Sequence, residues 1–140
     1  MKDNNNVLAY GVWSGGDYNT LEDFIYDNQS VQITNKYSYN GECSAQILSS
    51  GNTYVDLPTN ITSTGTYTVT LKILTENWVQ LRFLESWAGK SEVNISPNAD
   101  SWQSISLSAT FSDLSNIRIR IKNLGNTDRV FVDDVTLIKS

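Results

Sequence analysis

The stretch Thr64–Leu74, with the sequence TGTYTVTLKIL, alternates polar and apolar side chains from Thr66 to Ile73. Successive side chains of an extended chain point to opposite faces, so every second residue shares a face. The apolar face of this segment would consist of Tyr67, Val69, Leu71 and Ile73. The opposite face would carry Thr68, Thr70 and Lys72. A strict period of two over so many residues predicts a β-strand with one buried and one exposed face.

The same period of two recurs along the chain outward from this segment. It is seen in NWVQLRFLES (Asn77–Ser86), WQSISLSATF (Trp102–Phe111) and NIRIRIKNLG (Asn116–Gly125). Turn sequences rich in glycine, asparagine and serine separate these segments, and no segment has convincing helical periodicity. About eight to ten short strands at this spacing predict an all-β protein, an antiparallel β-sandwich or jelly roll of two packed sheets. We expect a single domain over residues 7–140, preceded by a frayed segment at residues 1–6.

Composition and charge exclude several classes of function. The net charge of −5 disfavours nucleic acid as a partner, because binding phosphates requires a basic face. No apolar run is long enough for a membrane-spanning helix, and no secretion signal is visible at the N-terminus. The chain has no histidine and a single cysteine, Cys43, which removes His-based catalysis, His-ligated zinc and any intrachain disulfide. We therefore expect no enzymatic activity, no nucleic-acid partner and no membrane.

The last segment, VFVDDVTLIKS, also reads as a strand, but it contains two adjacent carboxylates. Strict alternation places the first of them, Asp133, on the apolar face together with Phe131, Val135 and Leu137. The second, Asp134, then faces the other way. A buried carboxylate without a partner costs several kcal/mol, so a compensating group is needed. A lysine or arginine could supply it, but Ca²⁺ suits an all-β surface module better, because it takes oxygen ligands from both carboxylates and backbone carbonyls.

Four segments carry a resemblance to a known family. They are YSYNGECSAQIL, in which a glycine precedes a small-residue strand, GTYTVTLKIL, WQSISLSATF and RVFVDDVTLIKS. In this order the segments resemble the β-jelly-roll carbohydrate-binding modules of families 4, 9 and 22, which are galactose-binding-domain-like. The resemblance covers roughly residues 30–140. It implies a jelly-roll fold, a polysaccharide or glycan as partner, and a place within a longer multidomain secreted or cell-surface protein.

The resemblance also implies a structural calcium ion. In such modules the first acid of the Asp-Asp-Val sequence is a ligand, which corresponds to Asp133 here. The loop before the small-residue strand supplies carbonyl oxygens, which corresponds to the stretch from Lys36 to Gly41. An early acid completes the coordination shell, and Glu22 or Asp23 is the candidate. The alternative role for Asp133 is a surface salt bridge or an edge-strand charge.

A sugar-binding face should combine exposed aromatic rings, which stack on pyranose rings, with planar polar groups that bind the hydroxyls. Outward residues of two predicted strands fit this description, as do aromatic residues in three loops. The predicted carbohydrate-binding set is Trp78, Gln80, Arg82, Trp87, Arg118, Arg120, Tyr37 and Trp13. The alternative for each aromatic residue is structural packing, which the resemblance assigns to Trp102. Alternation alone does not determine which sheet carries the face.

Three functions can be compared. The first is a non-catalytic carbohydrate-binding module that targets a larger secreted or surface protein to a glycan and holds a structural calcium. The second is a protein-interaction or adhesive jelly-roll module of a surface adhesin or a phage structural protein. The third is a small glycan hydrolase, which needs two carboxylates facing each other across a cleft. Because Asp133 and Asp134 are adjacent and alternate in direction, they cannot form that pair, and we favour the first function and an extracellular location.

Overall fold

The computed structural model describes residues 31–39, 44–49, 54–86 and 88–140, and all structural statements concern these residues. They form strands, turns and bends without a helix. The strands among the described residues are β1 (Val31–Thr34), β2 (Ser44–Ile47), β3 (Tyr54–Pro58), β4 (Gly65–Thr75), β5 (Val79–Glu85), β6 (Ala88–Ile95), β7 (Asn98–Phe111), β8 (Arg118–Asn123) and β9 (Val130–Lys139).

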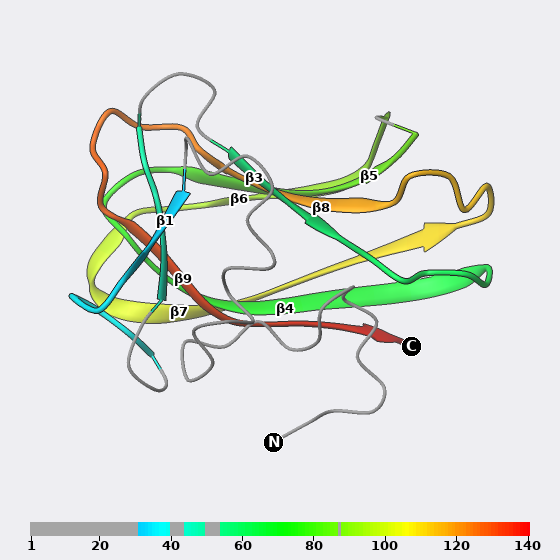
Figure 1. The fold of residues 1–140 in the computed structure, drawn as a ribbon, viewed down its shortest axis with the longest axis horizontal. Coiled ribbons are helices and arrows are strands. Elements are labelled where there is room, and N and C mark those ends of the chain that lie inside the picture. Colours follow the sequence, from blue (N-terminus) through cyan, green and yellow to red (C-terminus); the bar gives the residue numbers. More distant parts are fainter. Residues whose placement is uncertain (1–30, 40–43, 50–53, 87) are drawn as a thin grey trace.

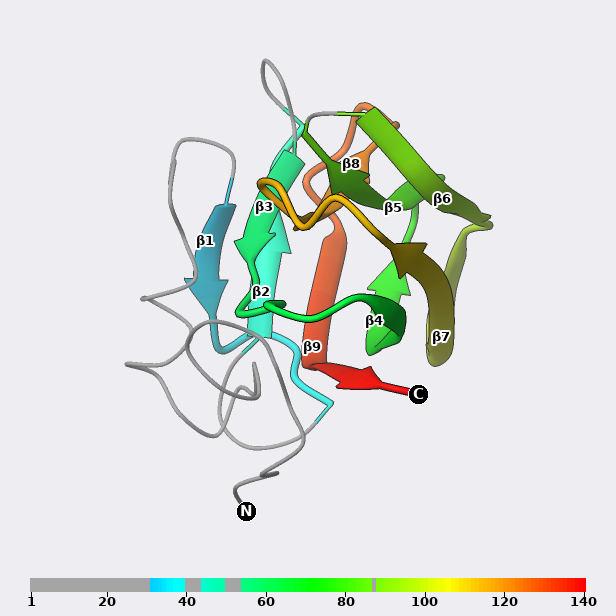
Figure 2. The ribbon, with the colours of Figure 1, turned by 90° about the vertical axis from the view of Figure 1, so that its right-hand side faces the viewer.

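The strands form two sheets that pack face to face (Figures 1 and 2). One sheet has five strands in the order β1-β2-β9-β4-β7, and the other has four in the order β3-β8-β5-β6. Every pairing between these strands is antiparallel. The chain crosses repeatedly from one sheet to the other, as in a jelly roll. The sequence-based prediction of an all-β sandwich of two packed sheets is therefore confirmed.

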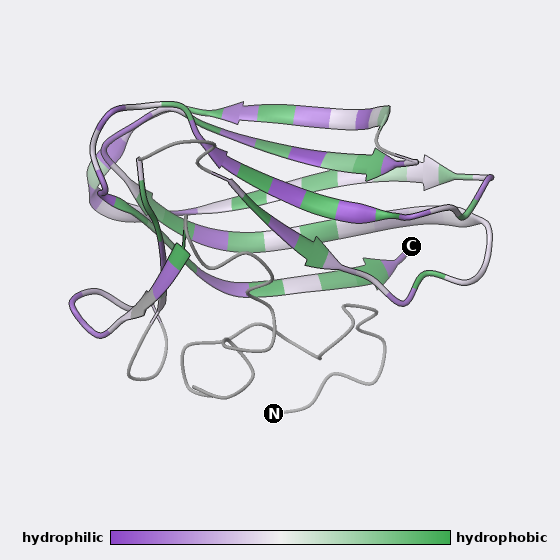
Figure 3. Ribbon diagram, turned by 45° about the horizontal axis from the view of Figure 1, so that its top comes forward, coloured by the Kyte–Doolittle hydropathy of each residue, from purple (hydrophilic) through white to green (hydrophobic). Residues whose placement is uncertain are grey.

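The facing sides of the two sheets bury one continuous apolar core. The four residues predicted to form the apolar face of the segment that begins at Thr64 are at most 2% exposed: Tyr67, Val69, Leu71 and Ile73. Phe83 of β5 meets Phe111 of β7 with ring centroids 5.3 Å apart, and so joins the two sheets. Hydrophobic and hydrophilic residues alternate along these strands, as Figure 3 shows. Full burial of each large side chain contributes about 1.5–3 kcal/mol, so this alternation is the main determinant of the fold.

The C-terminal strand departs from regular alternation at its two carboxylates. Thr70 of β4 pairs with Thr136 of β9, whereas Lys72 pairs with Asp133. Two residues along β4 therefore correspond to three along β9, and the extra residue is a β-bulge. Asp134 lies in this bulge with φ 51°, the left-handed conformation that aspartate tolerates better than most residues.

The bulge reverses the direction of side chains along β9. Val132 pairs with Ile73 and belongs to the core on one side of the bulge, and Val135 and Leu137 belong to it on the other. Asp133, which pairs with Lys72, consequently points to the outer face of the five-stranded sheet. The prediction that Asp133 shares a face with Val135 and Leu137 is wrong, because strict alternation counts Asp134 as a regular strand position, whereas Asp134 is the extra residue of the bulge. Asp133 is nevertheless 0% exposed, so its predicted burial is confirmed.

Candidate functional site

The outer face of the four-stranded sheet brings together five residues of the predicted carbohydrate-binding set. Directly paired residues on neighbouring strands point to the same side of a sheet. Gln80 pairs with Lys122 and Arg82 pairs with Arg120, while Leu84 pairs with Arg118. Trp78 immediately precedes β5 and has the same parity as Gln80 and Arg82. The members on this face are Trp78, Gln80, Arg82, Arg118 and Arg120, and we call it the β5–β8 face.

A bidentate ion pair fixes one side of the β5–β8 face. Arg120 donates from Nε to Oδ1 of Asp56 at 2.8 Å and from Nη2 to Oδ2 at 2.9 Å. The same guanidinium lies 4.0 Å from the centroid of the Tyr54 ring. The hydrogen bonds to Asp56 raise the pKa of Arg120 above its ordinary value. Such paired, stacked guanidinium groups are held in one orientation. Arg118 Nη1 lies 3.9 Å from Asp56 Oδ2, so both predicted arginines are anchored to the one carboxylate.

The polar groups of β5 are held more loosely than this ion pair. Gln80 Nε2 donates to Glu92 Oε2 at 3.2 Å, and Arg82 Nε lies 3.7 Å from Glu92 Oε1. Arg82 Nε makes no hydrogen bond with the described residues although it is buried. The Arg82 side chain as a whole is 30% exposed, and a guanidinium carries five N–H donors, so donors other than Nε are the ones that could reach a ligand. Gln80 and Arg82 therefore offer hydrogen-bonding capacity in the middle of the β5–β8 face.

Trp78 lies at one end of this face with 52% of its surface exposed. Its carbonyl oxygen accepts a hydrogen bond from the backbone N–H of Leu124 at 2.9 Å. The preceding residue, Asn77, is buried and donates from Nδ2 to Asn123 Oδ1 at 3.0 Å and to the Thr127 carbonyl at 2.8 Å. The hydroxyl of Thr127 donates in turn to Asn77 Oδ1 at 3.1 Å. A buried network with all partners present is rigid, so the backbone beneath the exposed indole is fixed.

Close packing around this network also explains a glycine. A Cβ atom added to Gly125 would lie 2.2 Å from Cγ of Asn77, which is nearer than any real contact. The N–H of Gly125 donates to Asn123 Oδ1 at 2.9 Å. Sequence reasoning missed Asn77 and Asn123, because asparagine beside a turn normally indicates only turn geometry.

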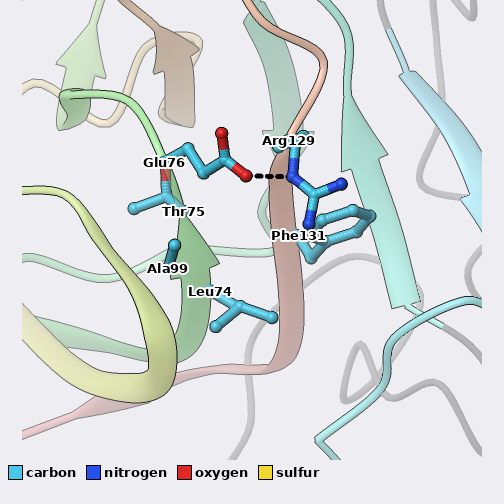
Figure 4. Close-up of a pocket in the computed structure, with 6 residues that line it drawn as sticks. All are labelled: Leu74, Thr75, Glu76, Ala99, Arg129 and Phe131. Carbon is cyan, nitrogen blue, oxygen red and sulfur yellow. Dashed lines mark ion pairs between the residues drawn. The ribbon is translucent and has the colours of Figure 1, made fainter.

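Tyr37, a sixth member of the predicted set, lies on the other sheet. Its ring centroid is 4.8 Å from that of Phe131, and its hydroxyl accepts from Arg129 Nη2 at 3.2 Å. Arg129 also forms an ion pair with Glu76. Figure 4 shows this ion pair, whose two residues line a small pocket together with Leu74, Thr75, Ala99 and Phe131. The structure therefore does not bring Tyr37 together with the residues of the β5–β8 face.

A second exposed tyrosine, Tyr39, lies on the same outer face of the five-stranded sheet. It is 48% exposed, and its ring centroid lies 5.9 Å from that of Trp102. Lys72 Nζ lies 5.0 Å from the centroid of the Tyr39 ring. Trp102 is partly buried in this contact, in keeping with the packing role that the sequence analysis assigned to it.

Asp133 fastens the segment that carries these tyrosines. Its Oδ2 accepts from the backbone N–H of Tyr39 at 3.0 Å, and its Oδ1 accepts from the N–H of Asp134 at 2.8 Å. Ser44 donates its hydroxyl to the carbonyl oxygen of Tyr37 at 2.6 Å. The two hydrogen bonds that Asp133 accepts help to offset the cost of burying its carboxylate, which is unfavourable without such partners.

The predicted calcium site is only partly within the described residues. Lys36 is described, is exposed and donates its N–H to Thr34 Oγ1 at 3.2 Å. Glu22, Asp23 and Gly41 lie outside the described residues, as do the predicted sugar contacts Trp13 and Trp87. Within the described part of the chain, no three acidic or cysteine side chains gather as a metal-binding group. There Asp133 supplies a single carboxylate, too few ligands for Ca²⁺ without others.

The same described ranges contain no helix with the length and apolar character needed to cross a membrane.

Comparison with known proteins identifies the fold. No protein-family profile and no curated protein sequence matches the chain. Among solved structures, the chain is similar to the carbohydrate-binding module CBM6cm-2 of lichenase 5A from Cellvibrio mixtus, solved in complex with cellotriose. The TM-score is 0.63 and the identity 14%, and the match covers 96% of this chain and 98% of that chain.

Two further solved structures illustrate the range of similar modules. The xylan-binding domain CBM22-1 of Xyn10C from Paenibacillus barcinonensis has a TM-score of 0.61 and 8% identity, with 91% of this chain and 92% of that chain covered. The module TmCBM61, solved in complex with β-1,4-galactotriose, has a TM-score of 0.62 and 15% identity, with 86% and 94% covered. At such identities the likeness concerns the fold: the chain has the β-jelly-roll fold of carbohydrate-binding modules, as its sequence motifs predicted.

Proposed function

We propose that this chain is a non-catalytic carbohydrate-binding module that binds a glycan along the β5–β8 face. The observation that carries the proposal is the exposed indole of Trp78, aligned on one strand face with Gln80 and Arg82. An exposed ring held on a fixed backbone is suited to stacking, because little conformational freedom is lost on binding. The similarity in fold to modules solved with cellotriose and with galactotriose supports the same function.

The face is suited to a linear glycan rather than to a single small molecule. Alternate residues of a strand are about 6.6–6.8 Å apart, so Trp78, Gln80 and Arg82 form a row of ~13 Å. Trp78 would stack on one sugar ring, while the amide of Gln80 and the guanidinium of Arg82 would bind the hydroxyls of the next rings. Arg120 and Asp56 already bind each other through two hydrogen bonds, so their role would be to keep the neighbouring surface rigid.

We further propose that the module is one part of a larger secreted or cell-surface protein, which it would concentrate on the glycan. Two solved neighbours come from the enzymes lichenase 5A and Xyn10C, which supports such an arrangement. A shallow surface row orders little and excludes little water, so the affinity of a single module should be modest.

A structural calcium ion at Asp133 is a separate proposal. Asp133 is a buried carboxylate whose two oxygens accept from backbone N–H groups, and carboxylate oxygens are among the ligands that Ca²⁺ takes. When bound, Ca²⁺ would neutralise this charge. The further ligands that we propose are carbonyl oxygens of the stretch from Lys36 to Gly41 and the carboxylate of Glu22 or Asp23; of these, Glu22, Asp23 and Gly41 lie outside the described residues.

The test of the glycan proposal compares two exposed aromatic residues on opposite sheets. Trp78→Ala removes the indole of the β5–β8 face, and Tyr39→Ala is the matched control, because Tyr39 is similarly exposed on the other sheet. Affinity electrophoresis against a panel of soluble polysaccharides would find a ligand, and titration calorimetry would measure its affinity. We expect Trp78→Ala to weaken binding at least about tenfold, which is ~1.4 kcal/mol, and Tyr39→Ala to leave it unchanged.

Two outcomes would count against the proposal. If Tyr39→Ala abolishes binding and Trp78→Ala does not, the glycan lies on the five-stranded sheet instead. If no polysaccharide binds while a protein partner is recovered, the adhesive or protein-interaction alternative is favoured.

A further inference from the structure

Strand β7 is the last strand of the five-stranded sheet. Within the described chain it pairs only with β4, in unbroken register from Gly65↔Phe111 to Ile73↔Gln103. Its other side therefore presents backbone N–H and C=O groups that no described strand occupies. Strands in this position are templates for pairing with another chain.

Natural proteins usually protect such edges with charged residues, proline or bulges, and β7 has none of these over its regular part. The stretch Ser101–Thr110, SWQSISLSAT, contains no charged residue and no proline. Both edge strands of the other sheet are protected: β6 carries Lys90 and Glu92 and has a register shift opposite Phe83, and β3 contains Asp56 and Pro58. Strand β1, the other edge of the five-stranded sheet, also lacks charge and proline but has only 4 residues, so β7 is the longest unprotected edge among the described strands.

The sequence of β7 is also self-complementary about Ser106. In an antiparallel pair of two β7 strands centred on Ser106, Ser104 would face Ser108 and Ile105 would face Leu107. The serine side chains are exposed on the outer face, whereas Ile105 and Leu107 are only partly buried at the margin of the core. A second strand would cover these two apolar residues. A two-fold symmetric dimer requires that residue i of one copy contact residue j of the other, and that residue j of the first contact residue i of the second.

The outer face next to this edge is neutral and regular. Hydroxyls of β4 and β7 face each other in three successive pairs, Thr66 with Thr110 at 2.7 Å, Thr68 with Ser108 at 2.7 Å and Thr70 with Ser106 at 3.3 Å. Two molecules that each carry a net charge of −5 would consequently meet at this seam without opposing like charges.

We propose that two copies of this chain pair through β7, antiparallel and with their two-fold axis at Ser106, so that the five-stranded sheets of both copies become one continuous sheet. The axis of such a pair is perpendicular to the sheet, so both β5–β8 faces point the same way. A dimer would then present two glycan-binding faces to one surface. The pairing itself does not depend on the glycan proposal.

Sedimentation over a range of protein concentrations tests the dimer. We expect the mass to rise from 15.7 kDa toward twice that value as the concentration increases. Ser106→Lys places a charge against its own copy at the axis and should shift the protein to monomer. Asn94→Lys is the matched control, because it adds the same charge at an exposed position on β6, the edge of the other sheet. Thermal unfolding of both variants would verify that they fold.

Disulfide trapping tests the register. In a Cys43→Ser background, which removes the only native thiol, Ser106→Cys would oppose itself across the axis with Cα atoms ~4.5–5.5 Å apart, within disulfide range. Ser104→Cys would lie roughly 13 Å from its own copy along the strands, so it should not crosslink. A mass of 15.7 kDa at every concentration would overturn the proposal. So would equal crosslinking of both variants, or capture of other extended peptides by a chain that stays monomeric.

Discussion

Replacing Glu85 should destabilise the protein strongly in neutral solution and weakly in acid. The side chain of Glu85, at the end of β5, is 6% exposed. Its Oε2 accepts from the backbone N–H groups of Asp113 at 3.1 Å and Leu114 at 2.9 Å, and Lys90 Nζ lies 3.4 Å from Oε1. These contacts hold the loop between β7 and β8, in which Leu114 has φ 59° and Asn116 has φ 52°. Loss of the carboxylate would leave that strained loop without its anchor.

The magnitude follows from the two backbone hydrogen bonds that Glu85 accepts. Hydrogen bonds to a charged group contribute about 1.5–3 kcal/mol each, and an amide left without a partner adds a desolvation cost. Because both donors share one oxygen, we expect Glu85→Ala to lower the free energy of unfolding by about 2–4 kcal/mol at pH 7. Glu85→Gln retains an acceptor oxygen of the same shape but loses the charge, so about half of that destabilisation is expected.

The pH dependence has a defined sign. Burial by itself raises the pKa of Glu85, but the hydrogen bonds from Leu114 and Asp113 and the ammonium of Lys90 outweigh it and hold the pKa below its ordinary value of 4.5. The unfolded state therefore binds more protons than the folded state. The stabilisation is complete above pH 4.5 and is lost as the pH falls through the lowered pKa of the folded protein.

Urea unfolding of the native chain and of Glu85→Gln at pH 7 and at pH 3 measures this effect. We expect the difference in unfolding free energy between the two proteins to shrink at pH 3. Using the difference cancels the contributions of the other carboxylates. The reasoning would be refuted if Glu85→Ala cost less than ~0.5 kcal/mol, the size of an ordinary surface change, or if the difference grew in acid.

Further predictions concern the buried network beneath Trp78 and the buried carboxylate of Asp133. Gly125→Ala should lower the free energy of unfolding by about 2 kcal/mol or more and weaken glycan binding, because the new Cβ would push Asn77 away and release the backbone beneath Trp78. A melting curve would measure the stability and titration calorimetry the glycan affinity. A variant with unchanged stability would contradict the close packing around Gly125. Asp133→Asn should cost about 1–3 kcal/mol, because both carboxylate oxygens accept from N–H groups and an amide can satisfy only one of them. A chelator should lower the melting temperature of the native chain but not of Asp133→Asn, since an ion bound only to the folded form stabilises it. An equal response of both proteins would argue against a calcium ion at Asp133.

The strands could be predicted because their pairing is regular where their sequences alternate. The segments around Val69 and Arg120 run through unbroken registers, so counting by twos assigns every side chain correctly. Counting fails at Asp133, because nothing in two adjacent aspartates indicates that one of them is an extra residue in a bulge. Alternation must be counted separately on each side of the bulge. A single count through it places Asp133 on the core face, whereas Asp133 lies on the outer face of the five-stranded sheet.

The composition of the β5–β8 face could be predicted only in part. Trp78, Gln80 and Arg82 belong to a single strand, so their common face follows from local geometry. The sequence places Tyr37 in the same set only by its chemistry, and the sheet against which it packs is decided by pairings with distant segments, which alternation does not encode. The buried amides of Asn77 and Asn123 also depend on a contact across 46 positions of the sequence.

The bulge at Asp134 has a consequence for how the C-terminal strand can change. It separates β9 into two halves whose inward positions are set independently, Val130 and Val132 before the extra residue and Val135 and Leu137 after it. Deletion of Asp134 would therefore bring the strand into strict alternation, with Val132 and Val135 facing inward and Asp133 facing outward between them. The C-terminal strand can thus lose its extra residue at this one position while both halves keep their hydrophobic side chains in the core.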